Sequence, residues 1–346
     1  MILSLSVASF LFAGRLDDFK KKNDKMLTDY KAELENLRKE IQEKNLKFRV
    51  KLTDQMKKKM EDITGLKVPD EDKKKPDDKK DEEKFEEEQK KKSDEDDSKK
   101  ADNRDQEKKE EKKKEDEKRP DNKYTDLRNN CDPTAVSFDW RTYKIVSPIK
   151  NQGSCGSCYM FSAMAAVEAN YKLFNNKDID ASEQHYLDCG NVGGCSGGWY
   201  GNVFTTLKSK GGISESDYPY KGNVGTCKLK SQGEYYTVAT GDVGKYLTVA
   251  DVQEVKEAIC KYGVLSSTVY VTKLFTAYAG GTFDEHPKVE GVNHAINIVG
   301  WDDKKKAYLI KNSWGTSWGE EGYMWIEYGS NNVGYGTQWV YPKKTE

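Results

Sequence analysis

The sequence predicts an α+β fold, because a helical segment and a set of short strands occupy different halves of one globular region. Between Tyr159 and Phe174 the only charged residues are Glu168 and Lys172, which is typical of a helix buried on nearly all sides. Downstream, β-rich runs alternate with turn clusters. The five runs that we expect to be strands are Tyr235 to Ala239, Leu265 to Val271, His294 to Trp301, Ala307 to Trp314 and Gly322 to Tyr328.

Charge separates this region from the N-terminal third of the chain. Residues 1–123 carry 36 of the 58 basic and 35 of the 59 acidic side chains of the 346-residue chain. The remaining 22 basic and 24 acidic side chains leave residues 124–346 nearly neutral. This body is long enough to bury a large core, in one unit or two packed lobes. It has no basic stripe, so nucleic acid is not an expected partner, and we expect a monomer.

The first fourteen residues, 1–14, are apolar and uncharged. Such a segment is too short to cross a bilayer but long enough for the core of a signal peptide. We therefore expect cleavage near Ala13 or Gly14 and no stable insertion in a membrane. The alternative is an amphipathic N-terminus that frays.

An amphipathic helical segment is expected to follow, over residues 15–68. Its apolar residues recur at alternating steps of three and four, a narrow seam that needs a partner surface. They are Leu27, Tyr30, Leu34, Leu37 and Ile41, and Phe48, Leu52, Met56 and Met60 continue the seam after a gap. One interpretation is a prosegment that docks on the body, and the other is a self-associating coiled coil.

Residues 69–123 form a low-complexity segment of Lys, Glu, Asp and Gln with one aromatic residue, Phe85. Such a composition cannot bury enough apolar surface to offset chain entropy. We expect a charged linker exposed to proteases, or alternatively an interaction tail.

Cys158 is the candidate nucleophile. It follows the small, loop-forming residues 151–157 and starts the buried helix, where the positive end of the helix dipole and unpaired N–H groups favour a thiolate. The seven cysteines leave one over after three disulfides, which also suggests a reactive thiol. The alternative is that Cys155-x-x-Cys158 is a redox pair or a zinc site.

A thiol nucleophile needs a base, and His294 is the best placed of the three histidines. The runs that begin at His294 and Ala307 are separated by a five-residue turn and should form an antiparallel hairpin. With that turn centred on Asp303, His294 pairs opposite Asn312. The Asn312 carbonyl could then accept a hydrogen bond from one imidazole nitrogen and leave the other for Cys158.

Gln152 is expected to complete the site, because it lies six residues before Cys158 on the same loop. Its side-chain amide and the Cys158 N–H could together bind an oxyanion, where one donor is worth about 3 kcal/mol. The candidate residues therefore predict acyl transfer.

These residues resemble the papain family of cysteine peptidases, in its cathepsin L-like group, over residues 131–342. The matching motifs are Asp139-Trp-Arg, residues 151–158, Ser182-Glu-Gln, residues 194–198, Asn293-His-Ala and residues 312–319. The resemblance implies a papain-like fold, with a helical lobe and a β-barrel-like lobe on either side of an active-site cleft. It assigns Cys158 as nucleophile, His294 as general acid and base, Asn312 as the residue that orients His294, and Gln152 as oxyanion donor.

The resemblance also implies supporting roles. Trp314 would shield the bond between His294 and Asn312, Gly197 and Gly198 would pair with the substrate backbone, and Trp199, Tyr200 and Ala295 would line the main specificity pocket. Two disulfides, Cys155–Cys195 and Cys189–Cys227, match the family, and Cys131–Cys260 is suggested as a third. In the prosegment, Arg38 and Asn45 fall at the spacing of the family's inhibitory helix motif, but Gln42, Arg49 and Thr53 replace residues that would usually be Phe, Ile and Asn.

The function that these observations predict is an endopeptidase, made as a zymogen with its own prosegment as inhibitor and acting on polypeptide substrates. No metal and no cofactor is expected. Cysteine usage indicates the secretory pathway, leading to a lysosome-like or vacuole-like compartment or to the extracellular space. The alternative is a catalytically silent scaffold of the same fold that carries a charged interaction arm.

Overall fold

The computed structural model describes residues 3–70, 87, 126–228 and 233–343, with side chains from residue 20 onward. The expected linker over residues 69–123 lies outside this part of the chain apart from residues 69, 70 and 87. Among the described residues, no helix has both the length and the apolar composition needed to cross a membrane.

Helices and strands segregate as the sequence predicts. The helices are α1 (Leu3–Glu43), α2 (Met60–Ile63), α5 (Cys158–Asn175), α6 (Glu183–Cys189), α7 (Tyr200–Lys210), α8 (Val252–Tyr262) and α9 (Lys273–Ala277), with 3-10 turns η1 (Gln55–Lys57), η3 (Leu127–Asn130), η4 (Trp140–Tyr143) and η5 (Ser330–Asn332). The strands are β1 (Phe48–Val50), β2 (Ser137–Asp139), β3 (Gly193–Gly194), β4 (Gly197–Gly198), β5 (Thr237–Asp242), β6 (Leu265–Val269), β7 (Tyr278–Phe283), β8 (His294–Asp302), β9 (Ala307–Lys311), β10 (Tyr323–Glu327) and β11 (Tyr335–Pro342).

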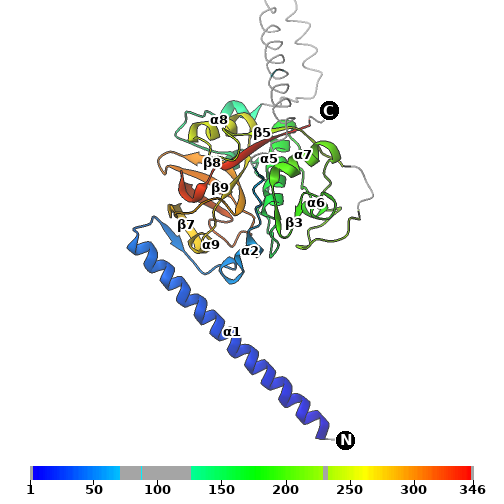
Figure 1. Ribbon diagram of the computed structural model, residues 1–346, viewed down its shortest axis with the longest axis vertical. Helices are drawn as coiled ribbons and strands as arrows, with labels where there is room; N and C mark the ends of the chain where they lie inside the picture. Colours follow the sequence, from blue (N-terminus) through cyan, green and yellow to red (C-terminus); the bar gives the residue numbers. More distant parts are fainter. Residues whose placement is uncertain (1–2, 71–86, 88–125, 229–232, 344–346) are drawn as a thin grey trace, which may run out of the picture.

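The body has a helical side and a sheet side (Figure 1). On the helical side, α6, α7 and the two-stranded β3–β4 ribbon lie beside α5. On the other side the strands form one sheet in the order β1-β7-β10-β9-β8-β6-β11-β5, with β2 also paired to β8. Only β7 and β10 pair in parallel. This arrangement confirms the predicted α+β class with two lobes.

Helix α5 joins the two lobes, because it packs against α6 and α7 on one side and against β8 and β11 on the other. Fifteen of its eighteen residues are buried, as its nearly uncharged sequence predicts. Its first residue, Cys158, is thereby held at the junction of the lobes.

Helix α8 is an element that the sequence reading missed. Asp251 and Glu254 form a capping box at its start, and Val255 and Ile259 are fully buried on its inner face. The signal was available, because an Asp-x-x-Glu start followed by apolar residues at helical spacing marks an amphipathic helix.

The N-terminal segment corrects the predicted helical seam. Helix α1 runs unbroken to Glu43 and extends away from the body (Figure 1), with Leu34 and Leu37 buried near its end. Asn45 then takes the left-handed conformation, with φ 54°, and the chain leaves the helix. Phe48 therefore lies in β1, which pairs antiparallel with β7, because the open edge of β7 outweighs the helical pattern of residues 48–60. Arg38 lies in α1, whereas Asn45, Arg49 and Thr53 lie beyond its end. The residues compared with the inhibitory helix motif therefore do not share one helix.

Candidate active site

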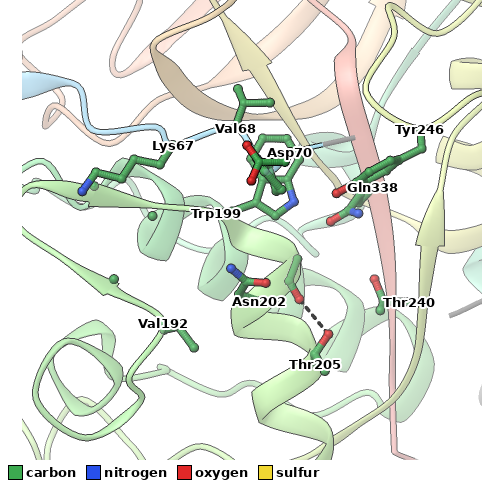
Figure 2. Close-up of a pocket in the computed structure, with 15 residues that line it drawn as sticks. Lys67, Val68, Asp70, Val192, Trp199, Asn202, Thr205, Thr240, Tyr246 and Gln338 are labelled. Atoms are coloured by element: carbon green, nitrogen blue, oxygen red, sulfur yellow. Dashed lines mark hydrogen bonds between the residues drawn. The ribbon is translucent and has the colours of Figure 1, made fainter. Parts of the chain in front are cut away.

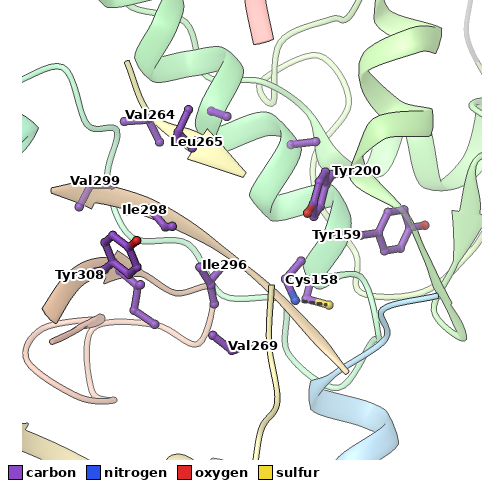
Figure 3. Packing of buried hydrophobic residues seen from close by; sticks show 14 of the residues in the cluster. Cys158, Tyr159, Tyr200, Val264, Leu265, Val269, Ile296, Ile298, Val299 and Tyr308 are labelled. Atoms are coloured by element: carbon purple, nitrogen blue, oxygen red, sulfur yellow. Dashed lines mark hydrogen bonds between the residues drawn. The ribbon is translucent and has the colours of Figure 1, made fainter. Parts of the chain in front are cut away.

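Helix α5 begins at Cys158, directly after the turn over residues 151–157. The N–H of Gly156 donates to the carbonyl of Cys195 (2.8 Å), which fixes this turn to the glycine-rich segment of the helical lobe. The Cys158 side chain is fully buried, and the N–H of Ala295 donates to its sulfur over 3.4 Å. Figure 3 shows Cys158 at the start of α5, at the edge of the apolar core. The start of β8, with His294, therefore lies against the thiol.

Burial changes the protonation state that the sequence predicts for Cys158. It raises the pKa of the thiol to about 12, and the N–H groups of Ala295, Tyr159 and Cys158 itself lower it by less. The expectation of a thiolate is wrong for this state of the molecule. The reason is desolvation, which outweighs the helix N-terminus because no water reaches the sulfur.

The segment that excludes water from the site belongs to the chain's own N-terminal part. Residues 63–67 cross the site between the lobes, with Ile63 almost fully buried. The N–H of Gly198 donates to the Gly65 carbonyl (3.0 Å), and the N–H of Lys67 donates back to the Gly198 carbonyl (2.9 Å). Gly198, one of the two glycines expected to bind substrate backbone, thus binds the backbone of this segment.

The opposite lobe holds the same segment. The carbonyl of Asn293 accepts from the N–H groups of Gly65 and Leu66, both at 3.2 Å, and the indole N–H of Trp314 donates to the Ile63 carbonyl (3.0 Å). Backbone groups from both lobes therefore hold residues 63–67 across the junction at which Cys158 lies.

His294 is bonded to Asn312 as expected. Nε2 of His294 lies 2.8 Å from Oδ1 of Asn312, and the same oxygen accepts from the N–H of Ser313 (2.8 Å). An atom that accepts from a backbone N–H is the amide oxygen, so Nε2 carries the imidazole proton. Nδ1 of His294 is buried and has no hydrogen-bond partner. Burial lowers the pKa of His294 to about 4, so its ring is neutral here.

The register that predicted this contact is wrong. Strands β8 and β9 pair antiparallel with Asp302 opposite Ala307, and a bulge between Ile298 and Gly300 moves the pairing back by one residue, to Asn297 opposite Lys311. His294 and Asn312 both lie beyond the paired residues and meet diagonally. The turn comprises residues 303–306, so its centre lies later in the chain than the predicted Asp303. Oδ1 of Asp302 accepts from the N–H of Lys304 (2.9 Å) and stabilises the turn at that place.

Trp314 lies over the imidazole. The two ring centroids are 4.8 Å apart at 35°, and Trp318 packs edge-on against Trp314 at 5.1 Å. The indole of Trp314 is buried. It therefore lies where it can keep water from the hydrogen bond between His294 and Asn312.

Gln152 is buried on the loop before α5. Its Oε1 accepts from the Ser313 hydroxyl (2.7 Å), and its Nε2 donates to the Cys155 carbonyl (2.9 Å). A carboxamide has two N–H donors, so one remains for a ligand. Ser313, which sequence reasoning missed, orients this side chain directly after the residue that orients His294.

The comparison with known families agrees with this geometry, since the profile described as "Papain family cysteine protease" matches residues 134–343. The chain belongs to the papain family of cysteine proteases.

Other papain-family proteins match the same region. The chain is 39% identical over 213 residues to "Cysteine proteinase 2" of Zea mays, covering 59% of this chain and 58% of that protein. It is 36% identical over 220 residues to "Pro-cathepsin H" of Mus musculus, covering 61% and 65%. The matched region spans less than two thirds of these relatives.

Solved structures of the family share the fold. Digestive procathepsin L 3 of Tenebrio molitor larval midgut matches with a TM-score of 0.56 and 31% identity, over 61% of this chain and 71% of that one. A cysteine protease of Carica candamarcensis, solved in complex with E-64, matches with a TM-score of 0.54 and 32% identity, over 61% and 100%.

The three residues assigned by resemblance to the papain-family specificity pocket lie in different places. Trp199 lines a cavity of about 490 Å³ together with Asn202, Gln338 and residues 67–70 (Figure 2). Tyr200 is fully buried beneath it, and its hydroxyl donates to the Gly336 carbonyl. Ala295 lines a separate space of about 10 Å³ behind Asn312. Of the three, only Trp199 faces the large cavity.

The pairing of the cysteines contradicts the alternative Cys155-x-x-Cys158 pair. All seven lie in the described part of the chain, where Cys131–Cys260, Cys155–Cys195 and Cys189–Cys227 are disulfides and Cys158 is free. Cys155 is therefore not available to form a pair with Cys158. Within the described residues, no three His, Cys, Asp or Glu side chains lie close enough together to hold a metal ion.

Proposed function

We propose that this papain-family chain is a cysteine endopeptidase that hydrolyses peptide bonds through Cys158, His294 and Asn312. The observation that carries the proposal is the state of His294. Its Nε2 is bonded to Asn312, its Nδ1 has no partner, and the residue after it contacts the Cys158 sulfur. A base oriented by a third group beside a thiol is the arrangement that covalent catalysis requires.

In the proposed reaction, Nδ1 of His294 takes the thiol proton and the sulfur attacks the peptide carbonyl. The Cys158 N–H and the free N–H of Gln152 bind the developing oxyanion. The imidazolium then gives its proton to the leaving amine as the C–N bond breaks, and an acyl-enzyme remains. Water, deprotonated by His294, hydrolyses the thioester and releases the acid.

The proposal includes synthesis as a zymogen, with residues 15–68 as prosegment. It is supported by the backbone bonds that residues 63–67 make to Gly198 and Asn293, because a substrate cannot use these groups while the segment is bound. A second contact supports the same role. The Lys47 N–H donates to Oδ1 of Asp284 (2.9 Å) beside β1, which anchors the segment outside the cleft.

The proposed compartment is an oxidising one. Three disulfides in the described body are typical of secreted and endolysosomal proteins. The apolar residues 1–14 would serve as the signal peptide. We propose polypeptides as the substrates.

The test is peptide mass spectrometry of the full chain at mildly acidic pH, with and without a thiol-directed epoxide. We expect one adduct, on Cys158, three intact disulfides, and loss of residues up to about 125. The Cys158→Ser variant should keep the disulfides but form no adduct and lose at least about 10³-fold in turnover, as for removal of a catalytic nucleophile. Turnover by Cys158→Ser, or an unlabelled and uncut wild type, would favour a silent scaffold instead.

A further inference from the structure

The loop over residues 152–157 connects the two proposed oxyanion donors, the Gln152 side chain and the Cys158 N–H. Gln152 begins it, and Ser157 ends it directly before Cys158. The two donors bind one oxygen only if this loop keeps its shape, because oxyanion stabilisation depends on distances of about 2.7–3.1 Å. A group that joins the two ends of the loop would hold that shape.

Tyr220 is such a group. Its hydroxyl donates to the Gln152 carbonyl (2.9 Å) and lies 2.8 Å from Oγ of Ser157. A tyrosine has one hydroxyl proton, so with that proton on the carbonyl of Gln152, Ser157 is the donor in the second bond. The Cys155 carbonyl lies farther from the Ser157 hydroxyl, at 3.3 Å, and is the competing acceptor for the same proton. Tyr220 therefore bridges the first and last residues of the loop.

The second bond has a consequence for helix α5. Ser157 is its N-cap residue, yet the Ser157 side chain makes no capping hydrogen bond, whereas an N-cap serine usually accepts from the second or third N–H of the helix. Turned toward Tyr220, the Ser157 hydroxyl leaves the N–H of Tyr159, the second of the helix, unoccupied by a cap. This N–H and that of Cys158 both face the Cys158 sulfur.

Tyr220 is itself fixed in place. Its ring packs edge-on against Phe161 of α5, with centroids 4.9 Å apart, and its N–H donates to the Glu215 carboxylate (2.7 Å). Burial raises the pKa of the Tyr220 hydroxyl to about 12, so the hydroxyl keeps its proton through the neutral and acidic range.

We propose that Tyr220 is a positioning residue for the oxyanion hole, which it holds by bridging the Gln152 carbonyl and the Ser157 hydroxyl. This inference rests on the proposed function. Tyr220 touches no reacting atom, so its removal should lower the rate of the chemical step and leave substrate binding unchanged.

The test is Tyr220→Phe in the full chain, matured by limited proteolysis and counted by titration of Cys158 with an epoxide. We expect kcat to fall about tenfold and KM to stay within twofold of the wild-type value. The expected fall in kcat lies between the effect of losing one neutral hydrogen bond and the effect of losing one oxyanion donor. Tyr218→Phe is the matched control. Tyr218 lies two residues before Tyr220, but its hydroxyl donates to Asp188 (2.9 Å), away from the loop over residues 152–157. This variant should leave kcat and KM within twofold.

A double variant tests the route of the effect. In the wild type, Gln152→Ala should lower kcat by a factor of about 10²–10³. When Tyr220→Phe is already present, the factor by which Gln152→Ala lowers kcat should be at least threefold smaller. Ser157→Ala should reproduce the kcat loss of Tyr220→Phe, which keeps the test open if Tyr220→Phe fails to fold.

Three outcomes would overturn the inference: a wild-type kcat in Tyr220→Phe and Ser157→Ala, the same kcat loss in Tyr218→Phe, or fully additive losses with Gln152→Ala. Failure of the proposed function looks different, because wild type itself would then show no turnover that depends on Cys158.

Discussion

At the scale of single residues, the proposed chemistry depends on which imidazole nitrogen carries the proton. Oδ1 of Asn312 accepts from both Nε2 of His294 and the Ser313 N–H, so it fixes the tautomer and the ring orientation together. Without that oxygen, the imidazole could rotate or exchange tautomers, and Nδ1 would spend less time as the base toward Cys158.

Replacement of Asn312 tests this role. In Asn312→Ala we expect kcat to fall about ten- to a hundredfold, a part of the roughly 10²–10⁴ that general acid–base catalysis supplies, with KM within twofold. Steady-state kinetics on the matured protein measure both. The control is Asn170→Ala, which removes a buried amide that bonds Val264 and Val340 and should lower stability but not kcat. A wild-type kcat in Asn312→Ala would contradict the assignment.

At the scale of elements, the segment over residues 63–67 meets the turn before Cys158 through backbone at Gly65. Gly65 has φ 142°, and a Cβ at this position would lie 2.0 Å from the carbonyl oxygen of Gly156. The Gly65 main chain and the Gly156 carbonyl group are both backbone, so neither can move aside at low energetic cost. Glycine is required at position 65 because the segment passes directly over the turn that precedes Cys158.

A side chain at position 65 should therefore release the site. We expect uncleaved precursor with Gly65→Ala to turn over a small peptide substrate at least about tenfold faster than wild-type precursor, a change of about 1.4 kcal/mol in the closed state. Activity is measured before any cleavage is visible on a gel. Lys67→Ala is the control, because its side chain is exposed and its backbone bond to Gly198 remains. Equal activity of Gly65→Ala and wild-type precursors would show that this contact does not hold the site closed.

At the scale of the whole molecule, burial changes the chemistry of the candidate nucleophile as well as access to it. Burial raises the pKa of the Cys158 thiol to about 12 in the covered state, above the value of about 8.5 for an unfolded chain. The folded precursor therefore favours the neutral thiol. This contribution to stability is complete below about pH 8.5 and is lost as the pH rises toward 12.

The same shift predicts the reactivity of the thiol. At pH 7 we expect iodoacetamide to modify Cys158 at least a hundredfold more slowly in the precursor than in the processed body, because the thiolate is the reacting species. In the precursor, the rate should climb steadily as the pH becomes alkaline. Mass spectrometry at short times follows both forms. Equal rates in the two forms would mean that residues 63–67 do not bury the sulfur in solution.

Much of the site was predictable, for reasons that lie in local sequence. Cys158 stands between a turn-forming segment and an apolar helix, and such a junction is recognisable from residue types alone. His294 and Asn312 were paired through an incorrect register, and they meet because the true register brings the ends of the two segments together diagonally. Ser313 and Tyr220 were missed because each acts through one hydroxyl group, and no spacing rule identifies which distant carbonyl or amide a hydroxyl will reach.

Fold class, the separation of helices from strands, and the choice of Cys158 as candidate nucleophile follow from residue type and periodicity, which act over a few neighbours. The tertiary structure decided whatever depends on distant backbone groups. Phe48 pairs with the edge of β7 instead of lying in a helix, and residues 63–67 bind between Gly198 and Asn293. Burial of Cys158 raises the pKa of its thiol, so the neutral form is favoured. Local pattern cannot report these features, since strand edges, cavities and desolvation arise only when segments far apart in the chain meet.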